Sequence, residues 1–240
     1  MARIPLADLR PLDRRFYARD PRRVARELLG RVLIRRRGRQ LLAGRIVEVE
    51  AYLGAGDLAA HAAAGKTAHN QVLFGPPGHA YVYFIYGTHY CLNVACEPEG
   101  EAGCVLIRAL EPVAPIAGLR AMAKARGLPA AECVDLESRP RLLRHLTSGP
   151  GRLCQALAIT RPRDNGKDVT SQRSDLYIAD AGFPQPRIAT TPRIGITKAT
   201  GEKLRYVIAD STFVSGPRKK DNHEGHEETR RNKQNLRETS

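Results

Sequence analysis

The segment Arg45–Gly54 alternates between apolar and polar side chains at every second residue. In an extended strand successive side chains point to opposite faces, so the two kinds separate. One face carries Val47, Val49, Ala51 and Leu53, and the other carries Glu48, Glu50 and Tyr52. The pattern predicts a strand that buries one side and presents two carboxylates and a ring on the other. A solvated sheet edge and a functional face fit this strand equally well.

The flanking sequence predicts both helices and strands. Asp20 and Pro21 are typical of a helix start, and Gly30 ends the apolar stripe that follows. Residues 32–34 and 41–53 then form the two arms of an antiparallel hairpin. Further strands are expected at 81–86, 90–95, 104–110, 176–179, 194–197 and 206–209, and helices at 115–126, within 132–146 and from 148 onward.

The length of 240 residues and a hydrophobic content of 42% suit one domain, with or without tails. From Gly216 onward the chain has almost no apolar residues and carries seven Lys or Arg against five Asp or Glu. We therefore expect a disordered tail that holds only +2 of the net charge of +14. The basic body predicts a polyanionic partner, most commonly nucleic acid, while an anionic membrane surface or a ribosome stays possible from charge alone.

No apolar run is long enough to span a bilayer, and Met1–Arg10 lacks the apolar core of a secretory signal. These features predict an intracellular protein, cytoplasmic or nucleoid-associated (nuclear in a eukaryote), without a membrane partner. The five cysteines are an odd number without a C-x-x-C pair, so we expect neither a disulfide framework nor a zinc site.

Several motifs together resemble the alkyladenine (3-methyladenine) DNA glycosylase family. The resemblance covers about residues 12–215 and rests on motifs in the family's order, which makes a chance match improbable. They are Glu48–Gly54, Asp57–His61, Tyr81–Gly87 with Asn93, Cys104–Pro112, Ser148–Leu157 and Arg193–Ile196.

The resemblance implies a mixed α/β (α+β) fold, with flanking helices, a curved antiparallel sheet and a protruding β-hairpin that enters the minor groove. It divides the chain into an arm at 1–11, one compact glycosylase domain at 12–215 and the tail at 216–240. It implies a monomer that hydrolyses the N-glycosidic bond of damaged purines in double-stranded DNA, with no cofactor and no metal. Such chemistry on a base requires the nucleotide to leave the stack.

The resemblance also assigns site residues. Glu50 corresponds to the general base that deprotonates a water, and Arg108 with the backbone carbonyl of Ile194 corresponds to the groups that position this water. The substrate-binding positions are Tyr52, Ala59, His61, Tyr83 and Asn93, where the rings sandwich the flipped base and Asn93 crowds the 2-amino group of guanine. The intercalating positions are Tyr86, the wedge, with Thr88 and His89 beside it.

Two neighbouring groups receive no catalytic role. We interpret Glu48 as structural or salt-bridged, although it shares a strand face with Glu50. Between Tyr52 and Asn93 the only lysine is Lys66, which leaves Schiff-base chemistry without an obvious nucleophile and predicts a monofunctional enzyme.

Two other function classes compete with this interpretation. A non-catalytic protein that binds distorted DNA or RNA would use the same basic body, but it would not need both Glu50 and Arg108. A metal-dependent nuclease is suggested by His61 and other histidines near Glu48. The spacing of these residues does not match a metal-ligand motif such as H-x-x-x-H beside a carboxylate.

Overall fold

The structure is a computed structural model that describes residues 5–85, 87–129 and 135–216. Within these residues one curled sheet of eight strands has β2 at its centre, and every strand pairing is antiparallel. The main order is β3-β4-β5-β2-β1-β6. The strands are β1 (Val32–Arg37), β2 (Gln40–Tyr52), β3 (Ala80–Ile85), β4 (His89–Cys96), β5 (Gly103–Pro112), β6 (Leu176–Ala179), β7 (Ile188–Thr191) and β8 (Arg205–Ile208).

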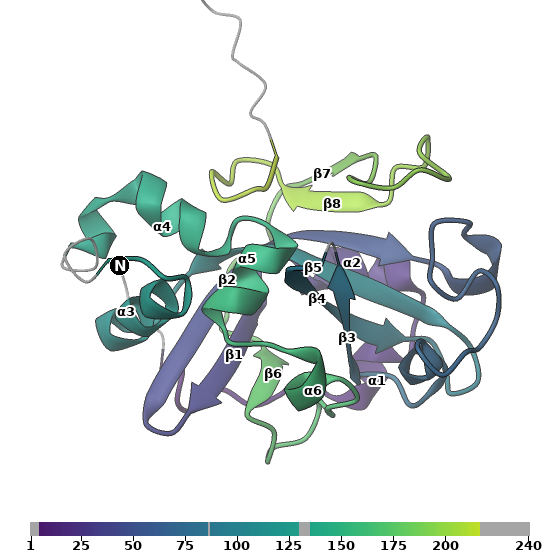
Figure 1. Ribbon diagram of the computed structural model, residues 1–240, viewed down its shortest axis with the longest axis horizontal. Coiled ribbons are helices and arrows are strands. Elements are labelled where there is room, and N and C mark those ends of the chain that lie inside the picture. The colour runs from purple at the N-terminus through teal and green to yellow at the C-terminus, as the bar shows by residue number, and fades with distance from the viewer. Residues whose placement is uncertain (1–4, 86, 130–134, 217–240) are drawn as a thin grey trace, which may run out of the picture.

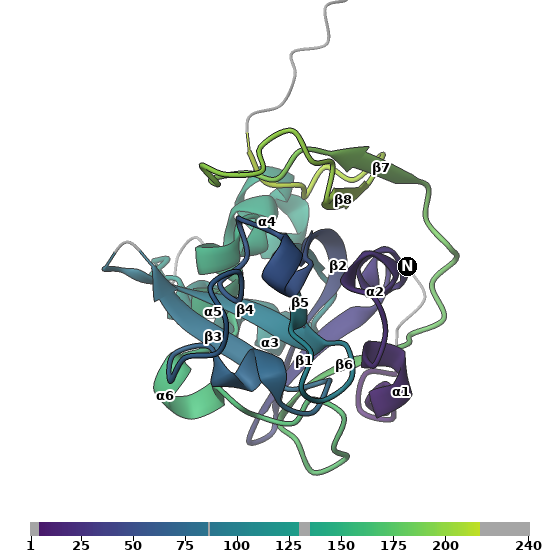
Figure 2. The same cartoon turned by 90° about the vertical axis from the view of Figure 1, so that its right-hand side faces the viewer.

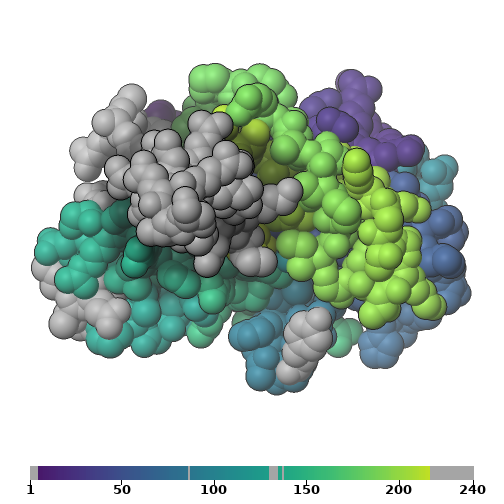
Figure 3. All heavy atoms as spheres, turned by 90° about the horizontal axis from the view of Figure 1, so that it is seen from above, coloured from purple at the N-terminus to yellow at the C-terminus, as the bar shows by residue number. Residues whose placement is uncertain are grey.

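Strand β2 changes partner along one edge. Its first half pairs with β1, and then Glu48–Glu50 pair with β8, which in turn pairs with β7. Figure 1 shows β7 and β8 raised above the other strands, and Figure 3 shows residues 185–216 spread over this upper face. Glu48 and Glu50 are consequently fully buried, so the solvated-edge interpretation of this strand is wrong.

The pairing of β2 with β5 is irregular at one place. The register shifts on both sides of Glu48, between Ile46 and Glu48 and again between Glu48 and Val49. Such a bulge bends a strand and changes the direction of its side chains, and bulges are frequent beside active sites. The irregularity lies where Glu48 of β2 meets Arg108 of β5.

Helices cover both faces of the sheet. In Figures 1 and 2, α1 and α2 lie on one side of the sheet, and α3, α4 and α5 lie on the other. The Asp20 side chain accepts a hydrogen bond from the Arg22 N–H and caps α2, as the sequence predicts. The helices are α1 (Arg14–Tyr17), α2 (Pro21–Leu28), α3 (Ile116–Ala125), α4 (Pro140–Thr147), α5 (Pro150–Ala156) and α6 (Arg161–Asp164), with short 3-10 turns at Gly54–Gly56, Gln71–Phe74 and Leu136–Ser138.

The predicted strand at 194–197 is wrong. These residues form an irregular segment, and the strand lies earlier, at β7. The Ile194 N–H bonds to the Glu50 carboxylate instead of a neighbouring strand. Gly195 has a φ of +78°, which an extended strand does not allow.

Strands β3 and β4 form the predicted hairpin, with Ile85 paired to His89 and Gly87 at a φ of +67° in the turn. In Figure 2 the ends of β3 and β4 next to this turn point away from β7 and β8, while His89 lies beside Gly151 of α5. Tyr86, the predicted wedge, lies outside the described residues. No helix among the described residues combines the length and the hydropathy that a bilayer span requires.

Candidate active site

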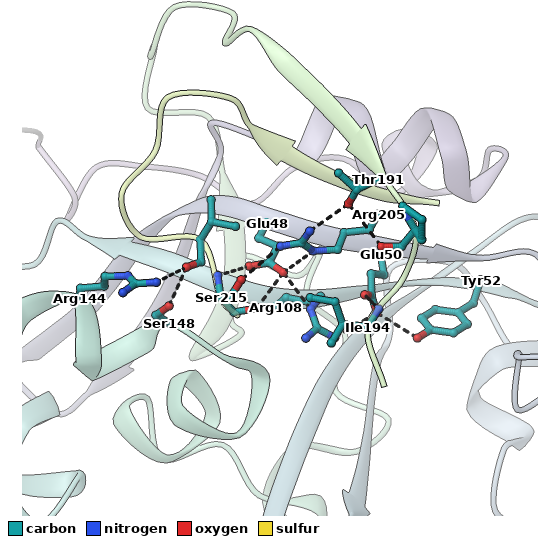
Figure 4. Close-up of polar contacts among 12 residues, drawn as sticks. Glu48, Glu50, Tyr52, Arg108, Arg144, Ser148, Thr191, Ile194, Arg205 and Ser215 are labelled. Atoms are coloured by element: carbon teal, nitrogen blue, oxygen red, sulfur yellow. Dashed lines mark hydrogen bonds and ion pairs between the residues drawn. The ribbon is translucent and has the colours of Figure 1, made fainter. Parts of the chain in front are cut away.

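The carboxylate of Glu50 accepts three hydrogen bonds from three different segments (Figure 4). The Ile194 N–H donates to Oε1 at 2.7 Å. Arg108 Nη1 and the Tyr52 hydroxyl donate to Oε2 at 3.1 and 3.0 Å. An ionised carboxylate has about four acceptor positions, and among the described residues Oε1 accepts only one bond. Oε1 therefore keeps an acceptor position that no described residue occupies.

Tyr52 acts as a donor in this arrangement. Burial raises the pKa of its phenol well above the ordinary value, and the negative charge of Glu50 raises it further. The phenol therefore stays protonated at neutral pH and donates to Glu50.

A pocket of about 660 Å³ opens in front of these donors. This volume is typical of a small-molecule site. Glu50 is absent from the pocket wall, but all three of its donors line it, so the carboxylate lies directly behind the wall. The predicted site residues that line the pocket are Tyr52, Ala59, His61, Tyr83, His89, Asn93, Arg108 and Ile194.

His61 and Tyr83 form one aromatic wall. Their ring centroids are 4.5 Å apart at an interplanar angle of 68°, so the rings meet edge to face. His61 Nδ1 also lies 2.9 Å from the Tyr81 hydroxyl. Desolvation by its surroundings lowers the pKa of His61, although part of this side chain reaches solvent. The imidazole is therefore neutral at neutral pH.

Asn93 lies buried on the pocket wall. Its Nδ2 donates to the Tyr81 carbonyl at 3.2 Å, and the Cys104 thiol donates to its Oδ1 at 3.7 Å. The amide is therefore fixed in one orientation. Sequence reasoning missed Tyr81 and Cys104, although the two-residue spacing of Tyr81 and Tyr83 on one strand is a signal for the former.

The turn end of the hairpin lies against the start of α5. A Cβ atom on Gly151 would lie 2.9 Å from Cγ of His89 and 3.0 Å from its Cβ, so glycine permits this approach. His89 lines the pocket and is exposed. Thr88 is also exposed, and its N–H donates to the Ile85 carbonyl.

Glu48 is salt-bridged, as predicted from the sequence. Its Oε1 lies 2.9 Å from Arg108 Nε and 2.7 Å from Arg205 Nε. Figure 4 shows it on the side of Arg108 away from Glu50. It does not line the pocket.

A buried ion pair between Asp57 and Arg193 was missed by sequence reasoning. The guanidinium donates to both carboxylate oxygens, at 2.5 and 2.8 Å, and both side chains are fully buried. Arg193 also donates to the Ala51 carbonyl and lies 4.7 Å from the centroid of the Tyr52 ring. It directly precedes Ile194, so the pair fixes the backbone that donates to Glu50.

A family model for methylpurine-DNA glycosylase matches residues 15–212. The chain belongs to the methylpurine-DNA glycosylase family. The family resemblance seen in the sequence is thereby confirmed, and membership makes the protein a hydrolytic DNA glycosylase of base excision repair with DNA as its substrate.

Three relatives each bear the name "Putative 3-methyladenine DNA glycosylase". The one from Koribacter versatilis is 61% identical over 218 residues, which span 91% of this chain and 99% of the relative. Those from Anaeromyxobacter dehalogenans and Rhodopseudomonas palustris are 43% and 47% identical over 209 and 206 residues. Each covers 86% of this chain, and the matches span 87% and 88% of these relatives.

Proposed function

We propose that this glycosylase removes alkylated or deaminated purines from duplex DNA as a monomer, and that Glu50 is its general base. Glu50 takes a proton from a water, the water oxygen bonds to C1′, and the bond from C1′ to the purine nitrogen breaks. The electron pair of this bond goes to the purine, so a cationic alkylated purine leaves neutral, and hypoxanthine takes a proton from solvent. Positive charge grows on the sugar during this step, so a nearby carboxylate both accepts the proton and stabilises the transition state.

The observation that carries this proposal is the position of the buried Glu50 behind three donors that line the pocket. Arg108 and Ile194 hold the carboxylate, and Oε1 beside the Ile194 N–H receives the water. The contact of this water with the Ile194 carbonyl stays a prediction. A non-catalytic binding protein would not need an ionisable group held in this way.

The aromatic pocket receives the flipped base. Tyr52, His61 and Tyr83 all line this pocket, and base–aromatic stacking contributes about 1–3 kcal/mol per base. Ala59 lines the same pocket. Tyr86 fills the gap in the stack, as apolar and aromatic wedges do in other minor-groove proteins.

The protein is monofunctional in this proposal, although one lysine does reach the pocket. Lys198 lines its rim and is exposed. A Schiff-base nucleophile needs a neutral amine, which enzymes obtain by desolvation or by a second cation. The exposed side chain of Lys198 lacks the first of these conditions, which supports hydrolysis by water.

The test is incubation with duplexes that carry 3-methyladenine, 7-methylguanine, hypoxanthine or ethenoadenine. We expect abasic sites that become strand breaks only after alkali treatment, both with and without a metal chelator. Strand breaks before alkali would contradict a monofunctional enzyme. Loss of activity with the chelator would favour the metal-dependent alternative.

Asn93→Ser should relax the exclusion of guanine. The shorter side chain no longer crowds the 2-amino group, and steric rejection weakens when the crowding group is trimmed. The measurement is the ratio of hypoxanthine release to guanine release. Asn165→Ser is the control, because Asn165 bonds to the Val82 N–H outside the pocket wall. An unchanged ratio in Asn93→Ser would place the selectivity elsewhere.

Binding to undamaged duplex should depend on phosphate contacts from the body and not on the tail. The measurement is the salt slope, the slope of the logarithm of the binding constant against the logarithm of the salt concentration. Arg152→Gln and Lys198→Gln, both at the pocket, should each reduce this slope by about 0.9 for every phosphate that the variant no longer neutralises. Arg37→Gln, at the far end of the β1–β2 hairpin, is the control. A chain that ends at Gly216 should keep most of the slope; a collapsed slope would make the tail the main DNA-binding element.

A further inference from the structure

Four charged side chains form an alternating row from β8 to Glu50. Arg205 Nε donates to Glu48 at 2.7 Å, and Arg108 Nε donates to the same Glu48 oxygen at 2.9 Å. Arg108 Nη1 then reaches Glu50 at 3.1 Å. Arg108 is therefore shared between two fully buried carboxylates: its Nε binds Glu48 and its Nη1 binds Glu50.

Glu48 depends on the segment that follows β8. The Ser215 N–H donates to Oε2 at 2.5 Å, and the Ser215 hydroxyl donates to Oε1 at 2.8 Å. With the two guanidinium groups, Glu48 accepts four hydrogen bonds, which is about the full capacity of a carboxylate. A fully buried carboxylate needs this satisfaction, because an unpaired buried charge is strongly unfavourable.

The same segment also reaches the backbone of Arg108. The Val214 carbonyl accepts hydrogen bonds from Arg144 Nη2 at 2.8 Å and from the Ser148 hydroxyl at 3.2 Å. The next residue, Gly149, donates its N–H to the Arg108 carbonyl at 3.0 Å. Figure 4 shows Ser215 beside Glu48, with Arg144 and Ser148 nearby. Two routes, one through Glu48 and one through Ser148, therefore converge on Arg108.

We propose that Ser215 is a positioning residue for base excision: it holds Glu48, and Glu48 holds Arg108 in the place from which Arg108 donates to Glu50. The inference rests on the proposed role of Glu50. If Glu48 is no longer held in place, Arg108 Nε loses its acceptor. Nε and Nη1 can then both donate to Glu50. Such a bidentate pair draws the carboxylate away from the Ile194 N–H, where Oε1 receives the water.

The test compares Ser215→Ala, Ser215→Thr and Ser211→Ala in the full chain. Ser215→Ala removes a hydrogen bond to a charged carboxylate. We expect this loss to slow single-turnover base release about three- to tenfold. Affinity for the lesion duplex should stay within about twofold, since no side chain of the pocket wall is altered. Ser215→Thr should restore the rate because it keeps the hydroxyl. Ser211→Ala should have no effect, because among the described residues the Ser211 hydroxyl takes part only in a local hydrogen bond, which it accepts from the Phe213 N–H.

A double-mutant cycle with Glu48→Gln separates positioning from general loss of structure. Ser215→Ala should slow a Glu48→Gln enzyme no further, because the effect passes through Glu48. Arg205→Gln provides a second background if Glu48→Gln does not fold, since Arg205 donates to the same oxygen. The inference would be overturned if the rate reductions of Ser215→Ala and Glu48→Gln multiplied in the double variant. An equal loss of excision rate and lesion-duplex affinity in Ser215→Ala would also overturn it.

The outcome also separates this inference from the proposed function. An active wild type with a neutral Ser215→Ala overturns the role of Ser215 alone. An enzyme whose rate is insensitive to Glu50→Gln overturns the proposed function, and the role of Ser215 with it.

Discussion

Glu50→Gln should release a damaged purine about 10²- to 10⁴-fold more slowly than the wild type. The amide cannot take the proton from water, and it cannot offset the positive charge that grows on the sugar. Its Nε2 must also face one of the present donors, since Ile194 binds Oε1 while Arg108 and Tyr52 bind Oε2. Single-turnover base release and lesion-duplex affinity measure the effect, and affinity should largely survive.

Glu111→Gln is the matched control for this substitution. Glu111 lies on the neighbouring strand β5, is half-buried and faces Arg45 at 3.6 Å, outside the pocket wall. The same change of charge there should leave base release unaltered. Near wild-type excision by Glu50→Gln would remove the general-base mechanism, while a parallel loss in both variants would point to a general effect of the missing charge.

Much of the fold was predictable because local patterns agree with the final pairing. The alternation around Glu50 predicts a strand, and it lies in β2. The hairpin turn at Gly87 and the helix cap at Asp20 also agree with their residue types. Each of these signals acts within a few residues, so the sequence contains the information directly.

The family motifs name several residues that line one pocket, but they do not name the contacts that support this pocket. The pocket brings together Tyr52, His61, Tyr83 and Asn93, as the resemblance implies. A periodic pattern cannot show that β8, which is joined to β7, pairs with β2 at Glu48–Glu50 and closes the sheet there. That closure depends on contacts between residues more than 150 positions apart, such as Arg205 with Glu48.

The path of segment 194–197 likewise depends on a contact between residues far apart in the sequence. Its apolar residues suggest a strand, but a single side-chain contact decides its path. Arg193 enters the interior to bind Asp57, and the following backbone turns at Gly195. Local propensity therefore yields to a buried ion pair that joins residues 136 positions apart.

The buried pair of Arg193 and Asp57 should contribute strongly to the stability of the fold. Arg193→Leu should lower the free energy of unfolding by about 3–5 kcal/mol, because it leaves Asp57 buried without its partner. Base release should fall as well, since Ile194 loses its anchor. Thermal unfolding and single-turnover excision measure the two effects. Arg187→Leu is the control: its pair with Asp210 has a similar distance of 2.7 Å but is about three-quarters exposed, so stability should change little.

A double variant separates stability from positioning. Arg193→Leu with Asp57→Leu removes both buried charges, and apolar replacement of a complete buried pair is often neutral or stabilising. Much of the stability should therefore return. Excision should stay slow, because Asp57 no longer holds the Leu53 and Ala59 N–H groups and Arg193 no longer fixes the backbone at Ile194. Recovery of the rate together with stability would show that the pair only stabilises the fold. Recovery of stability alone would show that it also sets the hydrogen bond from Ile194 to Glu50.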